Sequence, residues 1–73
     1  MVTVYEKPEC TQCEMTQKVL VSKGVPFKTE SLEDPENVRK VKEMGYMSAP
    51  VVVTPEVDSW AGFRPDKIGA LVA

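Results

Sequence analysis

With 73 residues, 42% of them hydrophobic, the chain has room for one modest core and no second domain, so we expect a single domain over residues 1–73. Nine Lys and Arg residues against eleven Asp and Glu residues give a net charge of −2, which leaves no basic surface for nucleic acid and no sign of a membrane surface. Two cysteines are too few for a disulfide-rich scaffold, and residues 1–10 carry no secretory signal, so we expect a cytoplasmic protein.

The start of the chain predicts a strand, a loop with the first cysteine, and a helix. Residues 2–5 alternate β-branched and aromatic types and lead toward Pro8, which is typical of a strand that feeds a loop. Residues 11–23 predict a helix that ends at Gly24, a C-terminal cap, and Cys10 lies at the start of this helix. Its apolar side chains at helical spacing are Met15, Val19 and Leu20.

The next segment predicts a second strand and a second helix. Residues 25–30 alternate apolar and polar types, so we expect a strand parallel to the first, joined to it by the helical crossover. Asp34, Pro35 and Glu36 combine an N-cap, a proline at the first helical position and an acidic first turn, which predicts a helix running to Gly45. Its apolar side chains at helical spacing are Val38, Val41 and Met44.

The last segment predicts a hairpin and a short helix. Residues 49–53 are typical of a buried strand opened by a proline, and residues 57–60 can pair with it across a turn at residues 54–56. Pro65 and Asp66 then start a terminal helix with Ile68, Leu71 and Val72 on one face. The predicted order of elements is βαβαββα, which indicates an α/β fold.

The C-x-x-C pair of Cys10 and Cys13 can be a redox couple, half of a metal site, or a structural staple. A staple is disfavoured because a reducing cytosol opens structural disulfides and because closing so short a loop removes little chain entropy. A zinc or iron–sulfur site requires a dimer or an outside thiol, since one chain offers only two soft ligands. The chain has no histidine, which excludes a Cys–His protease-type site.

As a redox couple, the two cysteines have different expected roles. Unpaired N–H groups and the positive end of the helix dipole stabilise a thiolate at Cys10, so Cys10 is the expected nucleophile. Lys7 adds positive charge while Glu9 and Glu14 oppose it, so we expect the pKa of this thiol to be moderately lowered. Cys13, one turn into the helix on the same side, is the expected resolving thiol, which attacks a mixed disulfide at Cys10 and releases the reduced partner.

Taken together, three features of the chain resemble the NrdH-redoxins. They are the C-x-x-C motif that opens the first helix, Ala49-Pro50 at the entry to the third strand, and the tail WAGFRPDK at residues 60–67, which is similar to the family's W-[SA]-G-F-R-P-D segment. The resemblance covers essentially the whole chain. It implies a minimal thioredoxin, or glutaredoxin-like, fold with a four-stranded mixed sheet flanked by three helices.

The resemblance also implies an activity. The protein would be a monomeric thiol–disulfide oxidoreductase with no bound cofactor, reduced by thioredoxin reductase and so indirectly by NADPH. It would pass two electrons to the large subunit of a class Ib ribonucleotide reductase. Two alternatives stay open: a metal-binding module in which the C-x-x-C pairs of a dimer share a site, and an ordinary glutathione-dependent glutaredoxin.

The resemblance further implies where partners bind. Pro50 is, on spacing alone, an edge-strand or turn proline, but the family implies a cis peptide that presents the Ala49 backbone to an extended partner segment. Glutaredoxins grip glutathione with a Gly-Gly and acidic pair where this chain has residues 61–64, although Lys7 matches a basic residue that they also use. Trp60 and Phe63 are either core aromatics or docking residues. The expected partner-binding residues are Lys7, Thr11, Gln12, Ala49, Pro50, Trp60, Gly62, Phe63 and Arg64.

Overall fold

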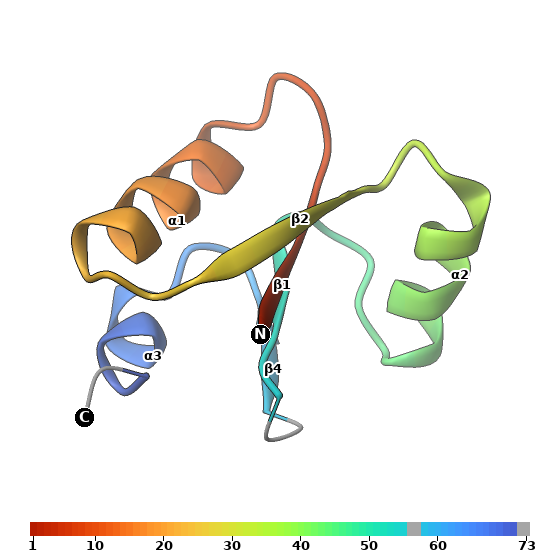
Figure 1. Cartoon of the computed structure of the whole chain (residues 1–73). Helices are drawn as coiled ribbons and strands as arrows, with labels where there is room; N and C mark the ends of the chain where they lie inside the picture. The colour runs from red at the N-terminus through yellow and green to blue at the C-terminus, as the bar shows by residue number, and fades with distance from the viewer. Residues whose placement is uncertain (56–57, 72–73) are drawn as a thin grey trace.

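The computed structural model describes residues 1–55 and 58–71, which form a four-stranded mixed sheet between helices (Figure 1). In chain order the elements are β1 (Val2–Glu6), α1 (Thr11–Ser22), β2 (Phe27–Ser31), α2 (Pro35–Glu43), β3 (Val51–Val53), β4 (Ser59–Ala61) and α3 (Pro65–Gly69). The strand order is β2-β1-β3-β4, with β1 and β2 parallel and the other neighbours antiparallel. The predicted βαβαββα order is confirmed. None of the helices in the described ranges has the length and apolar character needed to cross a membrane.

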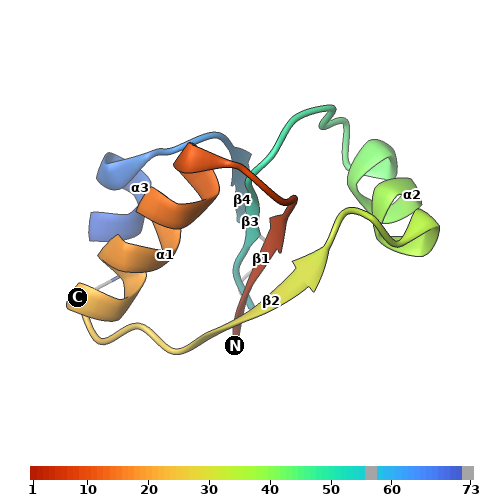
Figure 2. The same cartoon turned by 90° about the horizontal axis from the view of Figure 1, so that it is seen from above.

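The helices cover both faces of the sheet, with α1 and α3 side by side on one face and α2 on the other (Figure 2). The main core lies under α1 and α3 and consists of Val2, Val4, Leu20, Val52, Trp60 and Ile68. Because successive strand residues point to opposite faces, the fully buried Val51 points toward the α2 face, where Val41 is also buried. The sheet is therefore sealed more completely on the α1 face.

Local capping explains where α2 begins and ends. The Asp34 carboxylate accepts a hydrogen bond from the Glu36 N–H at 2.9 Å, and Pro35 occupies the first turn, as predicted. At the other end, Gly45 has a φ of +93°, and the Tyr46 N–H bonds back to the Val41 carbonyl at 3.1 Å.

Three predicted strands begin later than expected. The strand predicted over residues 57–60 is found at Ser59–Ala61, and hydrogen bonding explains the other two corrections. The strand predicted from Val25 begins at Phe27, because the Val25 N–H donates to the Leu20 carbonyl of α1 at 3.0 Å and Pro26 has no N–H. The strand predicted from Ala49 begins at Val51, since Pro50 has no N–H and its carbonyl bonds Gly62, just beyond the end of β4. The predicted Glu56, Val57 and Val72 lie outside the described residues.

The predicted apolar face of α1 is wrong in part. Its buried residues are Cys13, Thr16 and Leu20, whereas Met15 is 41% exposed. Two residues of helix correspond to about 200° of rotation, so Met15 lies on the far side from Cys13. Met44 is 39% exposed, because it follows the last turn of α2 and caps it.

Candidate active site

The turn between β1 and α1 positions the first cysteine. Glu9 has a φ of +56°, a left-handed conformation that is uncommon for a residue with a side chain and is found often at functional sites. Cys10 then returns to an extended conformation, with φ −111° and ψ 104°, and serves as the N-cap of α1. The reversal at Glu9 thus places Cys10 at the mouth of the helix, as the sequence predicted.

Cys10 and Cys13 are joined in a disulfide, with their Cα atoms 5.2 Å apart. The Cys13 N–H donates to the Cys10 sulfur at 3.2 Å, so this sulfur takes the place of a capping oxygen. Cys13 is only 2% exposed, while Cys10 is half-buried. Cys10 is therefore the more accessible of the two cysteines, and the Cys13 N–H is aimed at its sulfur.

The loop before β3 carries the cis peptide that the resemblance implied, at Ala49–Pro50. Pro50 is buried, and its carbonyl accepts a hydrogen bond from the Gly62 N–H at 2.8 Å. Ala49 is half-buried, and among the described residues its backbone N–H and C=O have no hydrogen-bond partner. Both groups can therefore pair with an added extended segment.

A hydrogen bond that no sequence pattern predicts connects the C-x-x-C motif to the tail. The Gln12 side-chain oxygen accepts from the Phe63 N–H at 3.3 Å, across 51 residues of sequence. Gly62, beside Phe63, has a φ of +86°, and a Cβ there would lie 3.7 Å from the same Gln12 oxygen. Gln12, which lies between the two cysteines, is therefore in contact with the tail at Phe63.

The aromatic and charged residues of the tail are placed differently from one another. Trp60 is 3% exposed and belongs to the core, so a partner would not meet its ring directly. Phe63 packs on the edge of this core and stays half-exposed. The Arg64 guanidinium makes two hydrogen bonds to the Asp66 carboxylate, at 3.2 and 3.1 Å. These bonds hold the pKa of Asp66 below its usual value. Thr11, the first residue of α1, is exposed.

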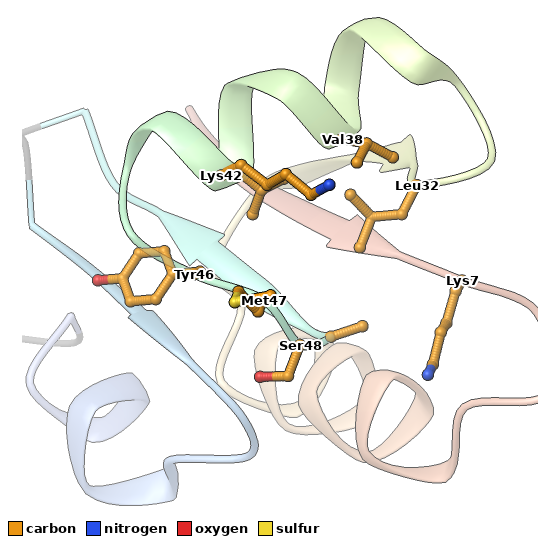
Figure 3. A pocket seen from close by; sticks show the side chains of 9 residues that line it. Lys7, Leu32, Val38, Lys42, Tyr46, Met47 and Ser48 are labelled. Carbon is orange, nitrogen blue, oxygen red and sulfur yellow. The ribbon is translucent and has the colours of Figure 1, made fainter.

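Lys7 lies at the edge of a cleft between α2 and the loop before β3 (Figure 3). The cleft has a volume of about 200 Å³, and Leu32 and Val38 lie in it between Lys7 and Lys42. Its complete lining is Lys7, Leu32, Val38, Val41, Lys42, Tyr46, Met47, Ser48 and Ala49. An apolar hollow with two lysines at its rim therefore adjoins Ala49.

A second hollow, of about 300 Å³, lies directly beside the disulfide and is rich in carboxylates. Its charged lining residues are Glu6, Lys7, Glu9, Glu14 and Glu33. The Glu6 carboxylate accepts a hydrogen bond from the Gln17 side chain. Lys7 thus lines both hollows. The second hollow also contains Glu9 and Glu14, the carboxylates expected from the sequence to oppose the charge of Lys7.

Residues 1–55 and 58–71 contain no group of three or more His, Cys, Asp and Glu side chains arranged to hold a metal ion. The two sulfurs are bonded to each other instead. A C-x-x-C disulfide at a helix N-terminus, with Cys10 half-buried and Cys13 buried, defines the class of thiol–disulfide oxidoreductases.

The chain belongs to the glutaredoxin family, whose model matches residues 2–57, and within it to the glutaredoxin-like NrdH proteins. It is 43% identical over 72 residues to the glutaredoxin-like protein NrdH of Lactococcus lactis subsp. cremoris (strain MG1363), a match that covers 97% of this chain and 99% of the relative. It is 32% identical over 71 residues to the NrdH protein of Escherichia coli (strain K12), covering 96% of this chain and 86% of that protein.

Solved structures agree with this assignment. The chain superimposes on the NrdH-redoxin of Escherichia coli with a TM-score of 0.90 at 32% identity, over 96% of this chain and 92% of that one. That protein is described as glutaredoxin-like with a thioredoxin-like activity profile. A glutaredoxin of Archaeoglobus fulgidus matches with a TM-score of 0.76 at 28% identity, over 97% of this chain and 84% of that one. The predicted thioredoxin-like fold and thiol–disulfide oxidoreductase class are confirmed, and proteins of this family act without a prosthetic group.

Proposed function

We propose that this protein is an electron carrier that thioredoxin reductase reduces and that delivers two electrons to the large subunit of a class Ib ribonucleotide reductase. The Cys10 thiolate attacks the disulfide of the partner and forms a mixed disulfide, and Cys13 then displaces the partner's thiol. The carrier leaves with the Cys10–Cys13 disulfide, which thioredoxin reductase reopens with electrons from NADPH. We further propose that it works as a monomer in the cytoplasm.

The observation that carries this proposal is the similarity, over nearly the whole chain, to proteins named NrdH. It includes a relative whose structure is described through a thioredoxin-like activity profile. A carrier of this kind has to offer one sulfur to partners and keep the other behind it. The half-buried Cys10 and the 2% exposed Cys13 suit these two roles.

The tail supports thioredoxin reductase, rather than glutathione, as the source of electrons. A glutathione carboxylate is bound best by free backbone N–H groups and positive charge. Here the Gly62 N–H already bonds the Pro50 carbonyl and the Phe63 N–H bonds Gln12. The Arg64 charge is paired with Asp66. The N–H groups and the positive charge at the position where glutaredoxins bind glutathione are thus already bonded within this protein.

Two surfaces beside the disulfide suit a protein partner. On one side the half-exposed ring of Phe63 offers an apolar contact next to Thr11 and Gln12, which follow Cys10. On the other side the free backbone groups of Ala49 can pair with an extended segment, with Lys7 at the rim of the neighbouring cleft. Trp60 acts in this proposal from within the core, by supporting Phe63.

The delivery step is tested by reconstitution. Purified class Ib ribonucleotide reductase is assayed for deoxyribonucleotide formation with NADPH, thioredoxin reductase and this protein, and the Cys10→Ser variant is the control. We expect turnover that requires the wild-type protein and disappears with the variant. A ribonucleotide reductase that turns over with dithiothreitol but not with this reduced protein would contradict the proposed acceptor.

A further inference from the structure

One hydroxyl in α1 is buried without a hydrogen-bond partner. Thr16 is 0% exposed, and its Oγ1 makes no hydrogen bond within residues 1–55 and 58–71. Threonines inside helices commonly bond the carbonyl three or four residues back, here Cys13 or Gln12, but this one does not. Buried polar groups are almost always paired, so this unpaired hydroxyl needs an explanation, and a redox role of the site is one that such groups can have.

The position of Thr16 points to that partner. It follows Cys13 by three residues on the buried face of α1, where residues three apart are neighbours with Cβ atoms about 5–6 Å apart. Side chains on a helix lean toward its N-terminus, so Thr16 covers the turn that contains Cys13. The sulfur of Cys13 is therefore the nearest reactive group on this face.

Reduction changes what this sulfur can accept. In the disulfide, Cys13 Sγ is neutral and a weak acceptor, whereas a thiolate is a strong one. At 2% exposure, Cys13 offers little surface to water even beside the second hollow, and burial disfavours the charged thiolate. The first-turn amide does not help, because the Cys13 N–H is aimed at the Cys10 sulfur. Cys13 thus lacks a donor, and Thr16 lacks an acceptor.

We propose that the Thr16 hydroxyl donates a hydrogen bond to the Cys13 sulfur in the reduced protein and so stabilises the resolving thiolate. In the resolving step this thiolate attacks Cys10 Sγ of the mixed disulfide. The Cys10–partner S–S bond breaks as the Cys10–Cys13 bond forms, and the electron pair leaves on the partner sulfur, which takes a proton from water. The proposal rests on the proposed roles of Cys10 and Cys13 and does not depend on which protein is the partner.

A two-phase reaction with the aromatic disulfide DTNB separates the two cysteines. Attack by the first thiol of the reduced protein releases one thionitrobenzoate in a second-order phase. Attack by the resolving thiol releases the second in a first-order phase. Both rates are measured from pH 5 to pH 10 by stopped flow for the wild type, Thr16→Val and Thr16→Ser. Thr29→Val, at an exposed threonine of β2, is the matched control.

Thr16→Val should leave the first phase unchanged and raise the pH midpoint of the second phase by about one pH unit. A thiolate of higher pKa is rarer but more nucleophilic, with a Brønsted coefficient near 0.5. The second phase should therefore be roughly threefold slower than wild type below the midpoint and roughly threefold faster well above it. Thr16→Ser should follow the wild type at every pH, and so should Thr29→Val.

A second-phase pH profile that Thr16→Val leaves unchanged would overturn the proposal, as would a loss of rate that is equal at all pH values or equal in both phases. If Thr16→Val does not fold, Thr16→Ala gives the same comparison. The assignment of the cysteines is checked separately with Cys10→Ser. Rapid second-order release by that variant would show that Cys13 attacks first, whatever the result for Thr16.

Discussion

Cys10 and Cys13 differ in the two properties that decide thiol reactivity, namely access and stabilisation of charge. Cys10 is half-buried, and its sulfur accepts a hydrogen bond from the Cys13 N–H. Cys13 is only 2% exposed. The thiolate is the reactive form, so a donor aimed at one sulfur favours attack by that sulfur. The asymmetry arises from the N-cap position of Cys10, because a residue there lies outside the helix and its neighbour three residues on lies within it.

The first prediction concerns this asymmetry. After reduction, iodoacetamide at neutral pH should modify Cys10 well before Cys13, as read by peptide mass mapping. Cys10→Ser should abolish disulfide reduction, whereas Cys13→Ser should still attack and accumulate a mixed disulfide with the substrate, because nothing resolves it. Faster modification of Cys13 than of Cys10 would reverse the two roles.

The second prediction concerns Gly62. Its φ of +86° is strained for any residue with a Cβ, so Gly62→Ala should lower the free energy of unfolding by roughly 1 kcal/mol. Gly69→Ala is the control, because Gly69 is helical and open space surrounds the new methyl group. It should leave stability unchanged or raise it by up to about 1 kcal/mol. Urea unfolding of both variants tests this, and equal losses would contradict the account of Gly62.

At the scale of the elements, helix α2 depends on its own termini more than α1 does. The main core lies under α1 and α3, while α2 covers the opposite face above a cleft of about 200 Å³ (Figures 2 and 3). Exposed ion pairs from Arg39 to Glu36 and Glu43 add little to stability, since exposed pairs contribute about 0–1 kcal/mol. The N-cap therefore contributes to the stability of this helix together with the buried Val41 and the bond from the Asn37 side chain to the Ser31 carbonyl at 2.8 Å.

The third prediction follows from that cap. Asp34→Ala removes the acceptor for the Glu36 N–H and should lower the free energy of unfolding by about 1 kcal/mol. Asp34→Asn keeps a capping oxygen and should lose much less. Urea unfolding monitored by far-ultraviolet circular dichroism measures both. If the two variants lose the same stability, the charge of Asp34 rather than its capping bond is what matters.

The type and order of the elements could be predicted because their signals are local. Asp34-Pro35 marks a helix start, and Gly24 and Gly45 mark helix ends, wherever they occur in a chain. The strand starts at Phe27 and Val51 depend instead on hydrogen bonds of Val25 and Pro50 with other elements, which local patterns do not contain. The exposed Met15 shows the same limit, since which helix face is buried depends on where the sheet lies.

The site shows the same division. The C-x-x-C motif and Ala49-Pro50 are short and recognisable, and the structure places both where the resemblance implied. The bond from Phe63 to Gln12 links residues 51 positions apart and could not be read from the sequence. The unpaired hydroxyl of Thr16 was also missed, because threonine on an apolar helix face is an ordinary core residue until its hydrogen bonds are known.

At the scale of the whole molecule, β1 leads into α1 at one end of the sheet (Figure 2), and the disulfide lies at the start of α1, where Cys10 is the N-cap. Phe63 is the apolar side chain that the tail leaves half-exposed near Gln12. Aromatic residues at such positions often carry much of the energy of protein–protein contacts. We therefore propose Phe63 as part of a docking surface that adjoins the C-x-x-C segment through Gln12.

The fourth prediction is that Phe63→Ala weakens coupling to thioredoxin reductase by about 1–2 kcal/mol in kcat/KM. Phe27→Ala is the matched control. Its ring also packs partly against the core, but Phe27 pairs with Val2 at the opposite end of β1 from the cysteines. NADPH oxidation at saturating insulin disulfide measures both variants, with stability measured in parallel. Equal losses in kcat/KM would mean that Phe63 acts only through folding.

The source of electrons is the central claim, and one comparison tests it directly. The oxidised protein is supplied with NADPH and either thioredoxin reductase or glutathione with glutathione reductase at physiological concentrations, and NADPH consumption is followed. We predict rapid reduction by thioredoxin reductase and little by glutathione, because Gly62, Phe63 and Arg64 use their binding groups within the protein. Comparable turnover with glutathione would contradict the account and identify the protein as an ordinary glutathione-dependent glutaredoxin.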